Sequence, residues 1–131
     1  IVRNRTHVAM DGMGVFAFTM SKVPKCIKNL LENFCIDVDE VDYLLLHQAN
    51  QYIDEKIRKK MRFSKDKTPY CLEKFGNTSS GTIPMTMVTK ISEQLRGGKN
   101  KLVMSGFGAG LSWAAVYVET EFIEVLPLIE I

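Results

Sequence analysis

The stretch LLLHQANQYIDEKI, Leu44 to Ile57, decides the fold that this sequence predicts. Val41–Leu46 is a short apolar run, which is typical of a buried strand covered on both faces. His47 ends the run, and a helix is predicted from Asn50 to about Met61, with acidic residues early and basic residues late. Two interpretations fit this pattern: an ordinary strand-to-helix turn, or a strand that delivers a histidine into a pocket.

Helices and apolar strands alternate along the rest of the chain. Val15–Phe34 has apolar residues at helical spacing, with Pro24 at a kink or near a helix start. A third helix is predicted from a cap at residues 78–80 to Leu95, ending at Gly97-Gly98. Strands are predicted at Lys101–Ser105 and Ser112–Val118, separated by the turn GFGAGL. They follow each other too closely for a crossover, so this pair is antiparallel and the fold class is an α/β sandwich.

The composition is that of one globular domain. The 131 residues are 46% hydrophobic and 24% charged with a net charge of +2, which argues against disorder and implies no partner by itself. No apolar run approaches the length of a membrane span, and nothing resembles a signal peptide. The three cysteines lack CxxC spacing, so we expect no disulfide framework, no metal site and a cytoplasmic location.

Three polar or glycine-rich segments stand at the ends of predicted elements: HQAN at His47, GNTSSG at Gly76–Gly81 and GFGAGLSW at Gly106–Trp113. Sites in open α/β sheets gather beyond the carboxyl ends of strands. Histidine suits hydrogen-bond or proton chemistry near neutral pH, and backbone amides of a glycine turn can hold an oxyanion. Each segment alone is better explained as an ordinary turn, and none is a phosphate-binding motif. Only their combination points to a site.

That combination resembles the C-terminal half of β-ketoacyl-acyl carrier protein synthase III, a condensing enzyme of the thiolase fold. The resemblance runs from about Met10 through Val118 and includes MDGMGVFAF, LLLHQAN, FGNTSSGTIP and GFGAGLSW in the family's order. It implies half of a thiolase-like layered sandwich, with a mixed sheet whose last strand is antiparallel, and flanking helices. Residues 1–131 would form this C-terminal domain, with residues 119–131 as an atypical extension.

The resemblance also implies a reaction. The family condenses an acyl thioester of coenzyme A with malonyl-acyl carrier protein, with loss of carbon dioxide, in fatty-acid biosynthesis; it uses a Cys-His-Asn set and no cofactor. His47 and Asn77 match the two donors that hold the malonyl thioester carbonyl and stabilise the enolate oxygen. His47 must therefore be a neutral donor whose pKa is not raised. The backbone amide of Ala109 matches an oxyanion position, and Asn50, Phe107 and Gly108 match substrate-binding positions.

The family's nucleophilic cysteine has no counterpart in this chain. In the family it opens a helix ahead of the region that this chain resembles. Cys26 falls on the apolar stripe of the first helix, Cys35 follows that helix at a turn, and Cys71 lies at an ordinary strand or loop position. We therefore expect half of an enzyme, inactive alone, that works with its own N-terminal half and is a homodimer when full length.

Seven basic residues against one acid lie between Lys56 and Lys67. Such a cluster is often a solvated face. A nucleic-acid patch is disfavoured, because Phe63 is the only interleaved aromatic residue and no nucleic-acid motif accompanies it. The resemblance favours docking of the acidic acyl carrier protein on Lys56, Lys59 and Lys60, with long-range attraction steering the encounter.

A few positions depart from the family's pattern. Tyr52 stands where bacterial members carry a docking arginine, Ala17 where they often carry lysine, and Leu111 replaces a common aromatic residue. Delivery of the extender by coenzyme A therefore stays open. The alternatives are a related condensing enzyme of a specialised acyl or polyketide pathway, and a non-catalytic thiolase-fold binding domain. Residues 122–131, FIEVLPLIEI, are expected to form an extra edge strand or an interface segment.

Overall fold

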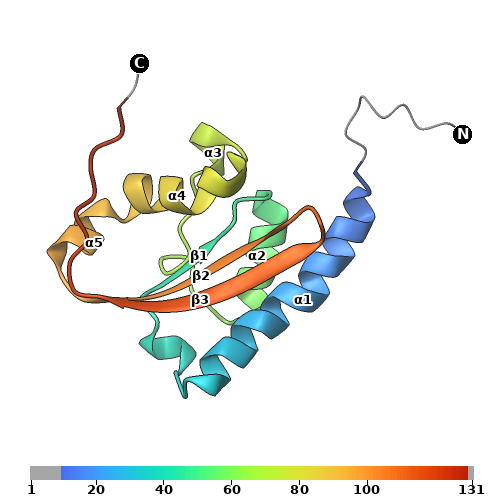
Figure 1. Ribbon diagram of the computed structural model, residues 1–131, viewed down its shortest axis with the longest axis horizontal. Helices are drawn as coiled ribbons and strands as arrows, with labels where there is room; N and C mark the ends of the chain where they lie inside the picture. Colours follow the sequence, from blue (N-terminus) through green and yellow to red (C-terminus); the bar gives the residue numbers. More distant parts are fainter. Residues whose placement is uncertain (1–9, 130–131) are drawn as a thin grey trace, which may run out of the picture.

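In a computed structural model, which describes residues 10–129, the chain forms a three-stranded mixed sheet with helices on both faces (Figure 1). The strands lie in the order β1 (Tyr43–Leu46), β2 (Asn100–Gly108) and β3 (Ser112–Thr120). β1 and β2 are parallel, whereas β2 and β3 are antiparallel, as the short connection between them predicted. The mixed sheet with an antiparallel last strand is therefore confirmed.

β1 is the most completely buried part of the sheet. Leu44 and Leu46 point into a cluster with helices α1 (Gly12–Asn33) and α2 (Gln51–Lys60), and Leu45 points into a second cluster on the opposite face. All three leucine side chains are fully buried. The alternation of side chains along a strand divides them between the two faces, so the prediction of a strand covered on both sides is confirmed.

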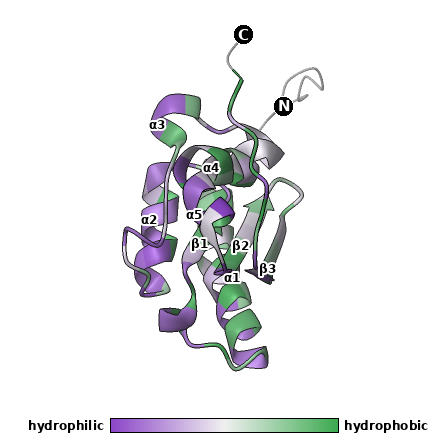
Figure 2. Ribbon diagram, turned by 90° about the vertical axis from the view of Figure 1, so that its left-hand side faces the viewer, coloured by the Kyte–Doolittle hydropathy of each residue, from purple (hydrophilic) through white to green (hydrophobic). Residues whose placement is uncertain are grey.

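Local signals set the bounds of α1 and α2. The side chain of Asp11 accepts a hydrogen bond from the N–H of Gly14 at the start of α1, and Asn50 accepts one from Ile53 at the start of α2. The apolar stripe predicted for α2 is buried against α1 and the sheet, whereas hydrophilic residues of α2 lie on the outside of the molecule (Figure 2). The inclusion of Phe34 in the helical stripe of α1 was wrong, because this residue is the C-cap and 64% exposed.

Pro24 lies inside α1 rather than at its start. A proline has no N–H, so the carbonyl of Met20, four residues earlier, loses its helical partner. The ammonium of Lys60 in α2 replaces that partner and donates to the Met20 carbonyl at 3.0 Å. This bond joins the two helices at the point where the sequence interrupts the hydrogen-bond ladder of α1.

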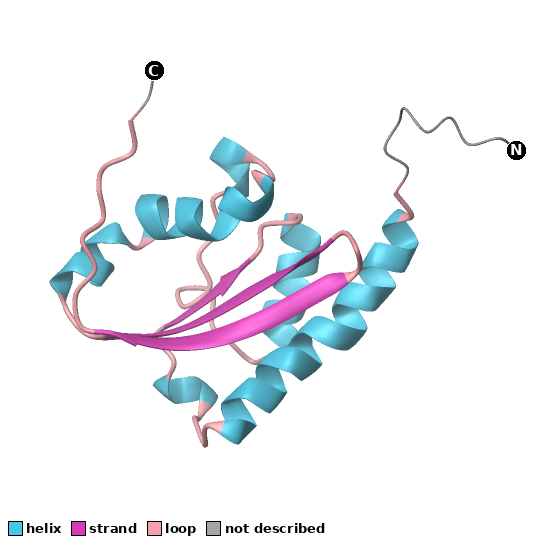
Figure 3. Cartoon of the chain, viewed as in Figure 1, coloured by secondary structure: helices cyan, strands magenta, loops and turns pink. Residues whose placement is uncertain are grey.

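The segment between α2 and β2 differs most from the prediction. In place of one helix it contains four short elements: α3 (Leu72–Phe75), the 3-10 turn η2 (Ser79–Gly81), α4 (Thr82–Lys90) and α5 (Ser92–Gly97) (Figure 3). No side chain from residues 78–80 caps α4. The break between α4 and α5 falls at Ile91, whose φ of −132° and ψ of 18° leave the helical region. Ile91 is buried with Leu45 and Leu95, and tertiary packing therefore accompanies the break.

Half of the glycine-rich segment at residues 106–111, predicted to be a turn, belongs to strand β2. Gly106, Phe107 and Gly108 belong to β2, so the predicted strands extend farther and only residues 109–111 form the hairpin turn. Gly110 has a φ of +118°, which side chains rarely tolerate. A Cβ atom on Gly106 or Gly108 would meet nothing within 4 Å, so the surface beside this end of β2 is open.

After β3, residues 121–129 form no strand, so an extra edge strand is wrong for the described part of this segment. The N–H of Ile123 donates to the carbonyl of Leu95 at 3.0 Å, and Val125 is buried in the same cluster as Leu45 and Leu95. Phe122 and Leu126 are exposed. The segment therefore packs on α5, and residues 130–131 lie outside the described residues. Within residues 10–129, no helix is long and apolar enough to cross a membrane.

Asp54 in α2 is buried without a hydrogen-bond partner among the described residues. Its side chain is fully inaccessible, and neither carboxylate oxygen has a hydrogen-bond partner among the described residues. Burial raises the pKa of this carboxyl from 3.8 to about 8. Asp54 lies in the first turn of α2, where the sequence places an acidic residue, but its burial is not evident from that position.

We expect Asp54→Asn to remove a pH-dependent loss of stability. The folded protein holds the proton of Asp54 up to a pH of about 8, whereas the unfolded chain loses it above about 4, so the contribution of the group to stability falls as pH rises between these values. The loss is at most about 1.4 kcal/mol per pH unit. Thermal unfolding from about pH 5 to 8.5 should separate the variant from the wild type progressively. The exposed Asp39→Asn is the matched control, and parallel curves for all three proteins would contradict the assignment.

Candidate functional site

His47 is held rigidly where β1 ends. Its N–H donates to the carbonyl of Ser105 at 2.8 Å, which continues the pairing with β2 by one residue. Its ring packs on Phe107 in a T-shaped contact, with centroids 5.3 Å apart and planes at 87°. Of the predicted substrate-binding residues, Phe107 is therefore the one that the fold packs directly on His47.

The imidazole of His47 is half-buried and bound to the start of α4. Its Nδ1 lies 2.8 Å from Oγ1 of Thr82, and that hydroxyl donates to the carbonyl of Ser79 at 3.0 Å. Burial lowers the pKa of His47, and a hydrogen bond to the backbone of Ser79 opposes this effect. The lowered pKa agrees with the neutral ring that the sequence resemblance requires.

Asn77 lies near this cluster but does not touch His47. Its Oδ1 accepts a hydrogen bond from the N–H of Ser79 at 2.9 Å, and among the described residues nothing bonds to its side-chain amide nitrogen. Ser79 therefore links both predicted catalytic residues, because its N–H serves Asn77 and its carbonyl serves Thr82, the partner of His47. Ser79 also has a positive φ of 56°, a conformation that is uncommon for residues other than glycine.

The other residues predicted to bind substrate or the oxyanion lie around His47 without a hydrogen bond to its ring in the described part of the chain. Ala109 is exposed in the hairpin turn, and its carbonyl accepts a hydrogen bond from Oγ of Ser112 at 3.0 Å. Gly108 ends β2 beside the open surface described above. Asn50 is exposed and caps α2, so its side-chain oxygen has a structural use. Roles for these three in substrate binding stay predictions.

The site lies on an open edge of the chain rather than in a closed pocket. Two hollows of about 580 and 450 Å³ occur, the first beside α3 and the second beside the end of α1, and neither is lined by His47 or Asn77. Asn77 and Ala109 are both exposed. Delivery of the His47 ring into a pocket therefore stays a prediction.

A buried polar network behind His47 went undetected in the sequence. The fully buried Gln48 accepts a hydrogen bond from the N–H of Cys71 at 3.2 Å, and Sγ of Cys71 lies 3.2 Å from Oγ1 of Thr86. Thr86 donates in turn to the carbonyl of Thr82 at 2.9 Å. The one available signal was the repetition of threonine at positions 82 and 86, four residues apart on one helical face.

The three cysteines have no catalytic surroundings within the described residues. Cys71 is buried in the network just described, Cys26 is half-buried on α1, and Cys35 is exposed after the helix; none forms a disulfide. No group of histidine, cysteine and acidic side chains in residues 10–129 could hold a metal ion.

Part of the basic cluster serves the fold instead of the surface. Arg58 binds Glu55 at 2.8 Å and the carbonyl of Phe63, and Lys67 donates to the carbonyls of Asp39 and Val41. Lys60 is the partner of the Met20 carbonyl. Three of the seven basic residues, Arg58, Lys60 and Lys67, therefore bond to other parts of the protein and are not simply solvated.

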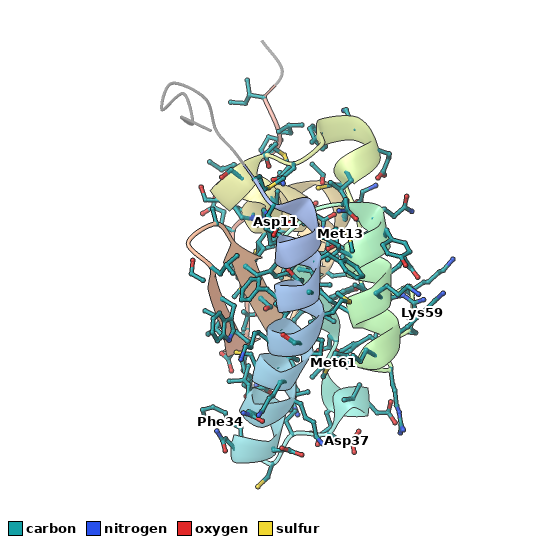
Figure 4. The ribbon with its side chains drawn as sticks, turned by 90° about the vertical axis from the view of Figure 1, so that its right-hand side faces the viewer. Asp11, Met13, Phe34, Asp37, Lys59 and Met61 are labelled. Carbon is teal, nitrogen blue, oxygen red and sulfur yellow. The ribbon has the colours of Figure 1, made fainter. Side chains whose placement is uncertain are left out.

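Lys56 and Lys59 remain on the outside of α2. Lys59 points away from α1 (Figure 4) and has no bonding partner among the described residues. The ammonium of Lys56 lies 5.2 Å from the ring centroid of Tyr52, which stacks on Phe16 at 5.9 Å. Positive charge is therefore present next to Tyr52, the position where the family pattern has an arginine.

Fold and site together define a thiolase-like α/β domain, in which a neutral histidine ends the strand that lies between two helical layers. Comparison with known proteins agrees. Residues 31–120 match the family model described as 3-oxoacyl-[acyl-carrier-protein (ACP)] synthase III C terminal. Because this match covers more than half of the chain, the chain belongs to that family.

Individual relatives support the assignment. The chain is 40% identical over 114 residues to the beta-ketoacyl-[acyl-carrier-protein] synthase III of Streptococcus gordonii, covering 86% of this chain and 35% of that protein. It superposes on a 3-oxoacyl-(acyl-carrier protein) synthase from Burkholderia xenovorans LB400 with a TM-score of 0.86 and 32% identity, covering 90% of this chain and 34% of that one. The chain thus spans about a third of the length of the relatives it matches.

A structure named for a polyketide pathway has the same fold. The priming beta-ketosynthase of the R1128 polyketide biosynthetic pathway superposes with a TM-score of 0.76 at 26% identity, covering 87% of this chain and 34% of that structure. This arrangement of strands and helices therefore also occurs in a protein named for polyketide biosynthesis.

Proposed function

We propose that this chain is the C-terminal, decarboxylating part of a synthase III type condensing enzyme, which joins an acyl thioester of coenzyme A to malonyl-acyl carrier protein. The observation that carries the proposal is the half-buried ring of His47, which is fixed at the end of β1, has a lowered pKa, and is linked to Asn77 through Thr82 and Ser79.

The chemistry follows from the charge that develops in the reaction. Loss of carbon dioxide from a malonyl thioester leaves an enolate, whose oxygen carries the new negative charge. An N–H from His47 and one from the side-chain amide of Asn77 would stabilise that oxygen more than the neutral carbonyl of the ground state. The amide nitrogen of Asn77 is available, because Ser79 occupies only the Oδ1 side. The resulting carbanion then attacks the acyl group on a cysteine.

That cysteine belongs to an N-terminal half in our proposal, and this chain alone should not condense substrates. Two observations support a missing partner: the relatives are about three times as long, and β3 is an edge strand with apolar side chains left exposed, among them Trp113 at 42% and Val116 at 46%. Exposed apolar side chains at a sheet edge are typical of an interface. We further propose that the full-length protein is a cytoplasmic homodimer.

A related condensing enzyme of a specialised pathway is the second candidate. It is favoured by the similarity to the polyketide priming synthase and by Tyr52, which replaces a docking arginine of the family with an aromatic stack. Both candidates use His47 and Asn77 in the same way, and they differ in the carrier and in the acyl group.

Single substitutions of the two donors test the proposal. His47→Ala and Asn77→Ala in the full-length protein should each lower the rate of malonyl-carrier protein decarboxylation by about 10²–10³, the usual effect of losing one oxyanion donor. Release of carbon dioxide is the measurement, and Asn29→Ala on the exposed face of α1 is the control. Rates in both variants that equal the control would reject the proposed function.

Carrier protein docking is the second part of the proposal. We propose that the ammonium groups of Lys56 and Lys59 attract an acidic carrier protein. Lys60 belongs to the predicted set, but its ammonium is bonded to the Met20 carbonyl. A charge reversal at Lys60 would therefore disturb the helix pair as well as the surface, and it cannot report on docking alone.

The double variant Lys56→Glu and Lys59→Glu should raise the KM for malonyl-carrier protein about tenfold at low salt, with kcat little changed, because reversal of exposed charges acts on encounter. The effect should shrink with added salt. Lys25→Glu, an equally exposed lysine on α1, is the control. A KM that stays at the control value, with malonyl-coenzyme A used equally well, would favour the second candidate over carrier protein docking.

A further inference from the structure

The segment that carries Asn77 lies exposed between two buried ends. Cys71 and Thr82 are buried, whereas none of residues 72–81 is. Most of this segment therefore lacks core packing, and the position of Asn77 depends on the groups that hold the two ends.

Two consecutive residues just after β1 hold those ends. The ring of His47 bonds to the side chain of Thr82, with Nδ1 and Oγ1 2.8 Å apart. The side-chain carbonyl of Gln48 accepts a hydrogen bond from the N–H of Cys71 at 3.2 Å. Because His47 and Gln48 are neighbours and follow a strand that is buried on both faces, both ends of the segment are fastened to one rigid point.

Gln48 has no capacity to serve a substrate. Its side chain is 0% exposed, and its Nε2 donates to the carbonyl of Leu46 at 3.0 Å while its Oε1 accepts from Cys71. A buried amide that loses a partner incurs the desolvation cost of the unpaired group, so these two bonds resist displacement. Gln48 therefore holds Cys71 firmly against the end of β1.

The bond to Cys71 reaches Asn77 through a single helical turn. Cys71 is the N-cap of α3, and its carbonyl accepts a hydrogen bond from the N–H of Phe75, the last residue of that helix. Gly76 is the C-cap, and Asn77 follows it directly. A displacement of Cys71 would therefore move the whole turn together with Asn77.

The other attachments near this end are weaker. The thiol of Cys71 lies 3.2 Å from Oγ1 of Thr86, and a thiol is a poor hydrogen-bond donor and acceptor. Glu73 and Lys90 form an ion pair at 2.7 Å, but their side chains are 64% and 35% exposed, and exposed pairs contribute little. The side-chain amide of Gln48 is therefore the main anchor of this end.

We propose that Gln48 is a positioning residue, which sets where the side-chain amide of Asn77 lies relative to the ring of His47. The role rests on the proposed function, in which both side chains donate to one enolate oxygen. Two donors reach one oxygen only at a fixed separation, and a misplacement of about 1 Å can cost about 10² in rate. Gln48 acts on this separation through Cys71 and α3.

Gln48→Met keeps the length of the side chain and removes both hydrogen bonds. In the full-length protein it should lower kcat for decarboxylation of malonyl-carrier protein by about 10–10², with KM changed less than about twofold, because the substrate still binds while the donors diverge. Transfer of an acetyl group from acetyl-coenzyme A to the protein's own cysteine should keep the wild-type rate, since that cysteine lies in the N-terminal half in our proposal.

Asn100→Leu is the matched control for a general loss of stability. Asn100 is another buried amide, bonded to the carbonyls of Gln94 and Gly98, at the end of β2 that lies away from His47. Both rates should stay near wild type in this variant. A kcat of Gln48→Met equal to that of the control, or a loss of decarboxylation matched by an equal loss of acetyl transfer, would overturn the positioning role.

Gln48→Glu provides a second test should Gln48→Met fail to fold. A protonated carboxyl group keeps one donor for Leu46 and one acceptor for Cys71, whereas an ionised carboxylate loses the donor. Burial at this position raises the pKa of the new carboxyl, so the protonated form persists in acid. The ratio of its kcat to the wild-type kcat should be near one at about pH 5.5 and fall at least about tenfold by about pH 8.5. A ratio that does not change with pH would overturn the proposal.

Hydrogen exchange at the N–H of Cys71 separates this proposal from the proposed function. Exchange should be at least about tenfold faster in Gln48→Met than in wild type and unchanged in Asn100→Leu, because only the first variant removes the acceptor of this N–H. Unchanged exchange in Gln48→Met would overturn the anchoring by Gln48. Faster exchange in a protein whose decarboxylation is unaffected by His47→Ala and Asn77→Ala would reject the proposed function and leave the anchoring intact.

Discussion

The burial of β1 between two packed layers is the constraint on which the rest of this structure depends. Leu44 and Leu46 anchor the strand to α1 and α2, and Leu45 anchors it to α4 and α5. Each fully buried leucine contributes about 1.5–3 kcal/mol. Because the strand is held from both sides, the residue that follows it has a fixed backbone. His47 is that residue, and its position is a result of core packing.

Features determined by local sequence could be predicted well. β1 and α2 were identified from neighbouring positions in the sequence: an apolar run, followed by a helix with an N-cap, early acidic residues and late basic residues. The antiparallel pairing of β2 and β3 followed from the short connection between them. The break at Ile91 could not be predicted, since a continuous helix satisfies the local pattern and only burial of Ile91 beside Leu45 opposes it. Thr82 escaped notice for a related reason: its partner His47 is 35 residues away.

The basic cluster illustrates how composition overstates a charged surface. Pro24 leaves a helical carbonyl without its helical partner, and the ammonium of the exposed Lys60 binds it. Arg58 and Lys67 likewise bond to backbone carbonyls. A count of charges cannot separate these residues from Lys56 and Lys59, whose ammonium groups remain on the surface. The difference lies in the backbone carbonyls that Arg58, Lys60 and Lys67 bind.

The exposed site and the greater length of the relatives are consistent with each other. His47 is fixed and neutral, Asn77 and Ala109 are exposed, and the edge strand β3 leaves apolar side chains uncovered. The central claim is that this chain stabilises developing charge for a nucleophile that it does not contain. Peptide mass spectrometry of the full-length protein after incubation with acetyl-coenzyme A tests that claim most directly. We predict an acetyl group on a cysteine outside these 131 residues, with Cys26, Cys35 and Cys71 unmodified. Stoichiometric acetylation of any of these three cysteines would contradict it.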